Sequence, residues 1–308
     1  MTLWQRQHAR MAPETAGFLL GFLGVAGFSA TLPATRVAVA YLDPTLVGLG
    51  RSILAGGVAA LLLWLTRQPL PSRRQFKSLA VIACGVIVGF PLLTAWAMQE
   101  LPAAHGAIVV AIIPLFTALV GAWRMGQRPS VGFWLCSVAG STLVLIFASV
   151  TGADGFETGD GLLILASLAA AIGYAEGGRL AKTLGGWQVI CWALVLAAPF
   201  LLLPVAFAVY RHGLVAPVEA WLGFAYVSLI SQLFAFVLWY QGLALGGVVR
   251  VSQVQLLQPF LTLIVAAVFL GEHLTPITLG FAVAVAVSVA LGRRMQIPLA
   301  QNSSWIVQ

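Results

Sequence analysis

Long apolar runs divide the chain, and short polar segments separate them. There are ten such runs, which cover residues 17–40, 45–65, 78–98, 104–123, 131–150, 161–181, 187–210, 220–244, 248–270 and 275–292. A membrane-spanning helix needs about 20 mostly apolar residues, whereas a strand of a membrane barrel needs about 10 residues of alternating polarity. Lipid offers no hydrogen-bond partner to the backbone, and none of the runs alternates. We therefore expect ten transmembrane helices.

The composition supports the same class. Hydrophobic residues make up 60% of the chain and charged residues only 8%, whereas a soluble domain carries about 25% charged residues. We therefore expect an all-α membrane protein whose surroundings are the lipid bilayer. The formal charge of +7 does not indicate a nucleic-acid partner, because the basic residues lie between the apolar runs. The three cysteines have no CxxC spacing, so they indicate neither a metal site nor a disulfide framework; no cofactor is expected.

The basic residues gather in alternate loops. Thirteen of the sixteen lie in the even-numbered loops and at the two ends of the chain, whereas the odd-numbered loops carry most of the acidic residues. Cytoplasmic loops of membrane proteins carry an excess of lysine and arginine. This distribution predicts that both termini are cytoplasmic.

The two halves of the chain resemble each other at a nearly constant offset of 145 residues, most clearly after Pro114 and Pro259. We expect a first five-helix repeat at 17–150 and a second at 161–293, with residues 1–16 and 294–308 as cytoplasmic ends. Because five is odd, the second repeat is expected to lie upside down in the membrane. Inverted repeats are typical of secondary transporters, whose binding site lies near the midplane between the repeats.

Pro114 and Pro259 occupy matching positions near the middle of the fourth and ninth runs. A proline removes one backbone hydrogen bond and kinks a helix. Paired interruptions in two halves indicate a binding site, so both prolines are predicted to act as hinges in gating. The alternative is that they only shape helix packing.

The stretches PLFTALVGAWRMGQRPS and PFLTLIVAAVFLGEHLT resemble the Pro…Gly-Glu helix pair of EamA-type transporters, in the drug/metabolite transporter superfamily. The stretch DPTLVGLGRSILAGG resembles the second span of that family. The resemblance implies ten helices, a central cavity and, as in bacterial members, export of small metabolites such as amino acids across the cytoplasmic membrane. The chain departs from the pattern in one place: the glutamate after the glycine is present as Glu272 but is Gln127 in the first repeat.

Charged side chains inside a membrane are costly and indicate function. Glu176 is the only carboxylate well inside a run, so it is a candidate for proton coupling. The alternative is an ion pair with Arg179 or with another cytoplasmic cation, which acts as a gate or a structural contact. Arg51 lies in the outer half of the second run. We expect a structural or gating role for Arg51, in which it caps helix carbonyls or pairs with Asp43; attraction of a substrate carboxylate is the alternative.

The ninth run is the most polar. On a helix, Gln255 and Gln258 lie about 60° apart, and Thr262 extends their stripe, whereas Gln253 points away. These amides suit a zwitterionic solute, and their alternative role is hydrogen bonding between helices.

Tyr174 is the aromatic residue best placed to line a cavity. Thr31 extends a stripe of glycines in the first run, formed by Gly17, Gly21, Gly24 and Gly27, which is expected to be a packing face. Other aromatic residues lie near the ends of runs and are predicted to belong to an interfacial belt: Trp96, Trp239 and Tyr240. The residues predicted to contact substrate are Tyr174, Thr31, Gln255 and Gln258.

These features favour a secondary transporter that works by alternating access, most simply an exporter of amino acids or similar apolar or zwitterionic solutes. A channel or a structural subunit of a larger complex is the alternative. The sequence has no HExxH, GxSxG or GxxxxGK[ST] motif, so we expect neither an enzyme nor catalytic residues. It leaves both a monomer and a homodimer open.

Overall fold

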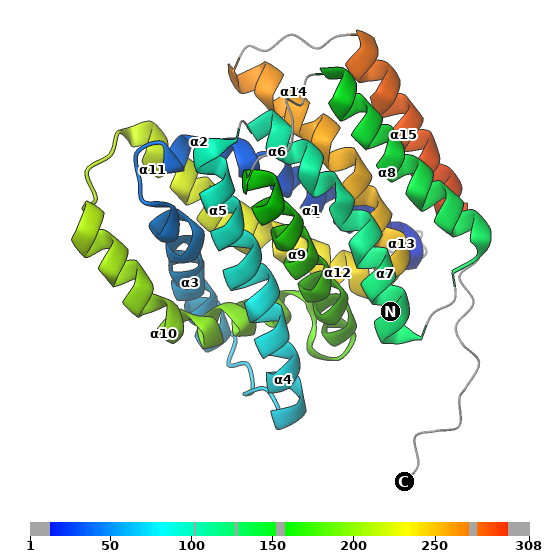
Figure 1. Ribbon diagram of the computed structural model, residues 1–308. Coiled ribbons are helices and arrows are strands. Elements are labelled where there is room, and N and C mark those ends of the chain that lie inside the picture. Colours follow the sequence, from blue (N-terminus) through cyan, green and yellow to red (C-terminus); the bar gives the residue numbers. More distant parts are fainter. Residues whose placement is uncertain (1–12, 102, 127–128, 152–157, 271–275, 295–308) are drawn as a thin grey trace, which may run out of the picture.

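The computed structural model describes residues 13–101, 103–126, 129–151, 158–270 and 276–294 (Figure 1). Within these ranges the regular elements are helices, and helical segments coincide with each of the apolar runs. The prediction of an all-helical chain is therefore confirmed for the described residues.

The helices of the first half include short π-helical and 3₁₀ segments. Their bounds are α1 Pro13–Ser29, α2 Thr31–Val39, π-helix η2 Leu46–Gly50, α3 Arg51–Leu65, α4 Arg73–Ile82, π-helix η3 Ala83–Gly89, α5 Phe90–Glu100, α6 Ala103–Val109, 3₁₀-helix η4 Val110–Ile112, α7 Ile113–Met125 and α8 Val131–Thr151.

The second half has longer continuous helices. Their bounds are α9 Thr158–Leu184, α10 Gly186–His212, α11 Val218–Ala225, π-helix η5 Tyr226–Ala235, α12 Phe236–Gly246, α13 Val248–Val251, 3₁₀-helix η6 Ser252–Leu257, α14 Gln258–Leu270 and α15 Pro276–Arg294. Adding 145 to the first and last residue numbers of the helical stretch Pro13–Val39 gives the bounds of Thr158–Leu184.

The protein is a multi-pass membrane protein. Seven helical stretches among the described residues are long and apolar enough to cross a membrane, and two further apolar helices are shorter. Large apolar side chains such as Trp64, Phe200 and Leu203 are exposed on the outside of the bundle. In a bilayer such side chains contact lipid, which is as apolar as leucine.

The main helix contacts come in pairs that are related by exchanging the two halves (Figure 1). Helix α1 packs against α12 in one pair, and α9 packs against α5 in the equivalent pair. Likewise α7 packs against α9, and α14 against α1. Contacts of α3 with α10, and of α8 with α15, each join equivalent helices. The chain therefore repeats one arrangement of helices twice.

The predicted packing face of the first run is confirmed. A side-chain atom added to Gly17 would clash with the backbone nitrogen of Gly246, and one added to Gly24 would lie 3.1 Å from the carbonyl oxygen of Ala235. Only glycine allows the two backbones to approach this closely. The stripe therefore sets how tightly α1 packs against α12 and η5.

Three π-helical segments, η2, η3 and η5, were not indicated by the apolar runs. Segment η3 accepts hydrogen bonds from both sides. Ser52 of α3, two residues after η2, donates to the carbonyl of Ile87 at 3.2 Å, and Gln232 of η5 donates to the carbonyl of Val86 at 3.1 Å. The π-helix is rare and is frequent at functional sites. Here the three segments bring spans of both repeats together in the interior.

Candidate functional site

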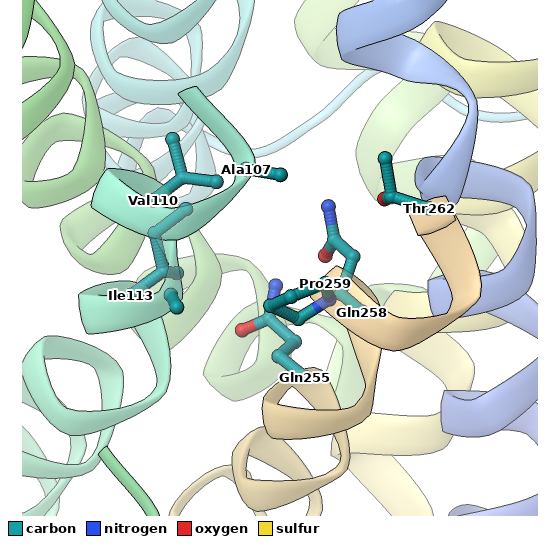
Figure 2. Close-up of a pocket in the computed structure, with 8 residues that line it drawn as sticks. Ala107, Val110, Ile113, Gln255, Gln258, Pro259 and Thr262 are labelled. Atoms are coloured by element: carbon teal, nitrogen blue, oxygen red, sulfur yellow. The ribbon is translucent and has the colours of Figure 1, made fainter. Parts of the chain in front are cut away.

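A small cavity lies between the fourth and ninth helical runs (Figure 2). Apolar side chains of α6, η4 and α7 face the polar side of η6 and α14. The lining residues are Ala107, Val110, Ala111, Ile113, Gln255, Gln258, Pro259 and Thr262. The space open to the centre of a water-sized molecule is about 10 Å³, which is room for about one water. The two runs therefore pack closely against each other around this space in this conformation.

The walls of this cavity carry the matched proline interruptions. In the first half, 3₁₀-helix η4 ends at Ile112 and Pro114 is the second residue of α7. In the second half, η6 ends at Leu257 and Pro259 is the second residue of α14. The two junctions differ by 145 residues, as the repeat does. Each run therefore changes helical type directly beside the cavity.

The polar stripe of the ninth run, Gln255, Gln258 and Thr262, lines this cavity. Gln255 is buried, and neither its amide nitrogen nor its amide oxygen has a hydrogen-bond partner. Figure 2 shows the Gln258 amide pointing into the space between the two runs. The Thr262 hydroxyl donates to the carbonyl of Ser29 at 2.7 Å. Gln253 does not line the cavity. A solute between the runs would therefore meet the unpaired amide of Gln255 and the amide of Gln258.

Tyr174 belongs to a buried aromatic cluster that joins α1, α9 and α12. Its ring centroid lies 5.5 Å from that of Trp239, 5.8 Å from Phe236 and 6.4 Å from Phe28. The Tyr174 hydroxyl also lies close to the Gln255 amide, but outside hydrogen-bond geometry. The aromatic cluster is therefore continuous with the polar side of the cavity.

The prediction that Trp239 and Tyr240 belong to an interfacial belt is wrong. Both side chains are 0% exposed, and the Tyr240 hydroxyl donates to the carbonyl of Gly173 at 3.3 Å. Helix α12 continues to Gly246 and packs against α1 and α9, so both residues lie inside the bundle. Trp96 is 40% exposed.

Arg51 is buried without a partner. Its side chain is 2% exposed, and its Nε has no hydrogen-bond partner. The expected pairing with Asp43 is wrong, because the Asp43 carboxylate accepts from the backbone nitrogens of Thr45 and Leu46 and contacts His212 at 3.2 Å. Asp43 is local to the start of its own helix, whereas Arg51 points into the bundle, where it interacts with Tyr174.

Glu176 lies in a charged network away from the cavity. Its carboxylate contacts Arg179 at 2.5 Å and Arg124 at 3.1 Å, and Arg179 donates to the Ser78 hydroxyl at 2.8 Å. The carboxylate is buried, whereas both arginines are about half exposed. The expected ion pair with Arg179 is present, and Arg124 and Ser78 extend it. The network ties α9 to α7 and α4.

Thr31 does not line the cavity. Its hydroxyl is 2.8 Å from the hydroxyl of Ser231, which joins α2 to η5. Because 31 and 176 differ by 145, Thr31 occupies the position in the first repeat that Glu176 occupies in the second. Two equivalent positions therefore tie equivalent spans together, once with neutral groups and once with charges.

The comparisons with known proteins decide the family. Residues 15–150 and residues 157–292 each match the EamA-like transporter family. The chain belongs to this family. The resemblance seen in the sequence is thereby confirmed, and the protein is a transporter with two copies of the family's repeat.

Relatives of this EamA-like transporter are themselves named as transporters. The chain is 45% identical over 285 residues to the uncharacterized transporter YdeK of Bacillus subtilis, covering 92% of this chain and 99% of the relative. It is 29% identical over 281 residues to a probable terminal-alkyne amino-acid exporter of Streptantibioticus cattleyicolor, covering 88% and 92%. A crystal structure with 18% identity matches it with a TM-score of 0.71 over 90% of this chain and 98% of that one, which shows the same fold.

The structure of this EamA-like transporter also reveals residues that sequence reasoning missed. Arg124 and Ser78 complete the Glu176 network. The Gln232 amide nitrogen donates to the carbonyl of Val86 and so joins two spans, while its amide oxygen has no partner. Gln232 carried a visible signal, because it lies in the middle of an apolar run. Arg124 and Ser78 did not, since they lie near the ends of runs, where polar residues are common.

Proposed function

We propose that this EamA-like transporter is a secondary exporter of amino acids or similar small apolar or zwitterionic solutes across the bacterial inner membrane. The observation that carries this proposal is the cavity at the two matched proline junctions, where the unpaired amide of Gln255 and the amide of Gln258 face the other repeat. The relative that is named as an amino-acid exporter supports the substrate class.

The proposed topology has ten spans in two inverted five-helix repeats, with both termini in the cytoplasm. The exchange of helix contacts between the halves supports the repeat, and the loop charges support the orientation. A reporter fused after Arg294 is expected to give a cytoplasmic signal, and one inserted at Asp154, which lies outside the described residues, a periplasmic signal. Opposite signals at both sites would overturn the orientation.

The proposed mechanism is alternating access. The cavity has room for about one water, so a solute enters only when the fourth and ninth runs separate. In the proposed orientation, the Glu176 network joins α9, α7 and α4 on the cytoplasmic side of the midplane. The Thr31–Ser231 contact and the bonds from Arg36 to the carbonyls of Met98 and Gln99 join spans on the other side. Breaking the Glu176 network alone would open the cavity to the cytoplasm, and breaking the Thr31 and Arg36 contacts alone would open it to the opposite side.

Counterflow in liposomes tests the proposal. Liposomes with the purified protein are loaded with unlabelled L-phenylalanine, L-leucine or propargylglycine, and uptake of the same labelled solute is followed. A carrier is expected to show saturable uptake that rises with internal solute, because the loaded site returns faster than the empty one. A channel gives uptake that neither saturates nor depends on internal solute. Such a result, or no uptake of any of the three, would contradict the proposal.

The proline hinges are tested by replacement. Pro114→Ala and Pro259→Ala each allow one more backbone hydrogen bond beside the cavity. That bond is worth about 1 kcal/mol, which corresponds to a flux reduction of about fivefold at each site. Pro199→Ala is a suitable control, because Pro199 lies inside α10 and does not line the cavity. Wild-type flux in the Pro114/Pro259 double variant would exclude the hinge role.

A further inference from the structure

The Arg51 guanidinium is a charge without a counter-ion in the described structure. Arginine stays protonated in proteins, and an unpaired charge buried away from water is costly. Arg51 nevertheless makes no hydrogen bond or ion pair with any described residue, and it is 2% exposed. The carboxylate that the sequence suggested as its partner, that of Asp43, is engaged elsewhere, and so is the buried carboxylate of Glu176. The position lacks an anion.

The surroundings of Arg51 are those of a binding site. Tyr174, with which Arg51 interacts, is in contact with the ring of Trp239, whose indole Nε1 is buried and has no acceptor. Tyr174 also lies close to Gln255, whose amide lines the cavity. Two buried donors without acceptors, Arg51 Nε and Trp239 Nε1, therefore lie in the region of Tyr174, which is close to the cavity-lining Gln255.

We propose that Arg51 binds the carboxylate of the transported solute, and that the solute class is therefore an amino acid or another apolar molecule with a carboxylate. The aromatic cluster around Tyr174 would take the apolar part. The amide oxygens of Gln255 and Gln258, with the aromatic faces, would take an ammonium group. One unpaired cation matches the one carboxylate of such a solute. This inference rests on the proposed function, which it deepens by naming the chemical group that is recognised.

Competition in the counterflow assay tests the carboxylate. Labelled L-phenylalanine is the transported probe, and the competitors are 3-phenylpropionate, which lacks the amine, and phenethylamine and phenylalaninamide, which lack the carboxylate. Arginine forms charged hydrogen bonds with carboxylates, so loss of the carboxylate is expected to weaken competition about 10- to 100-fold. The wild-type protein is therefore expected to accept 3-phenylpropionate and reject phenethylamine.

Variants locate the effect at Arg51. Arg51→Gln is expected to weaken the binding of phenylalanine about 10- to 100-fold and to leave the weak competition by phenethylamine unchanged. Arg51→Lys is expected to keep part of the preference, because it keeps the charge but not the planar fork. Arg36→Gln is the matched control, since Arg36 donates to the carbonyls of Met98 and Gln99; its variant is expected to keep the preference.

Two results would overturn the inference while leaving the proposed function intact. One is wild-type counterflow of phenylalanine with equal competition by phenethylamine. The other is an Arg51→Gln protein that transports and keeps the preference for carboxylates. If Arg51→Gln does not fold, the wild-type competition and Arg51→Lys still decide. If phenylalanine, leucine and propargylglycine all fail to exchange in the wild type, the proposed function itself fails, and the inference fails with it.

Discussion

Two of the buried charged side chains, those of Glu176 and Arg51, have opposite surroundings. The Glu176 carboxylate contacts two guanidinium groups, one of them in the other repeat. Arg51 has neither an ion pair nor a hydrogen bond within the described residues. Burial of a charge therefore does not by itself reveal its role. A charge with its partners in place holds spans together, whereas a charge without one can receive a ligand.

The same contrast governs stability. Removing one member of a buried ion pair leaves the other uncompensated and is destabilising, whereas replacing a buried charge by an apolar group of similar volume is often neutral or stabilising. Substitutions at Glu176 and Arg51 are therefore expected to change the free energy of unfolding in opposite directions.

The largest effect is expected for Glu176→Gln. Both arginines lose their carboxylate, but they are half exposed and regain water, so we expect a loss of about 2–3 kcal/mol rather than the full cost of a buried pair. Thermal unfolding in detergent measures it. Glu219→Gln, at an exposed position at the start of α11, is the control and is expected to change little. Equal stability of the two variants would show that the network does not hold α9 in place.

The same variant separates a gate from a proton carrier. If Glu176 only joins spans, Glu176→Gln alters flux without changing its dependence on an imposed pH gradient, because the ion pair carries no proton through the cycle. If Glu176 couples transport to protons, the variant loses the gradient dependence and retains exchange of solute for solute. Its place in an ion-pair network away from the cavity favours the first outcome. Flux at several pH gradients in liposomes measures it.

A smaller effect of opposite sign is expected for Arg51→Met. Methionine is flexible and close in volume, and it removes the unpaired charge, so the solute-free protein is expected to gain about 1–2 kcal/mol of stability. The stabilisation that phenylalanine gives to the wild type is expected to disappear. Thermal unfolding with and without phenylalanine measures both. Arg36→Met is the control and should lose stability, because the Met98 and Gln99 carbonyls of α5 lose the donor that Arg36 supplies. Loss of stability in Arg51→Met would show that Arg51 has a structural role.

The smallest effect is expected for Thr31→Val, at the position equivalent to Glu176. The variant loses one neutral hydrogen bond to Ser231, which is worth about 0.5–1.5 kcal/mol. Thermal unfolding beside Glu176→Gln compares the neutral and charged contacts of the two repeats directly. Thr66→Val, whose hydroxyl bonds only to its own helix, is a suitable control. A loss at Thr31 as large as that at Glu176 would remove the distinction between the two repeats.

Much of the architecture follows from the sequence by local rules. The length of each apolar run determines a helix, because a backbone in lipid must satisfy its own hydrogen bonds. The offset of 145 residues predicted the repeat, and it also predicted that Pro114 and Pro259 lie at equivalent junctions. The stripe from Gly17 to Gly27 and the stripe of Gln255 and Gln258 follow from helical periodicity alone.

Only the tertiary structure decided which partners these side chains meet. Trp239 was expected at an interface and lies in the interior, Arg51 was expected beside Asp43 and is buried without it, and Thr31 contacts Ser231 instead of the cavity. Periodicity gives the face of a helix on which a residue lies, but not the helix that packs against that face. In a membrane every outer face is apolar as well, so hydrophobicity cannot distinguish lipid from protein as the neighbour. The missing partner of Arg51 became visible only when the structure showed that the Asp43 carboxylate is engaged elsewhere.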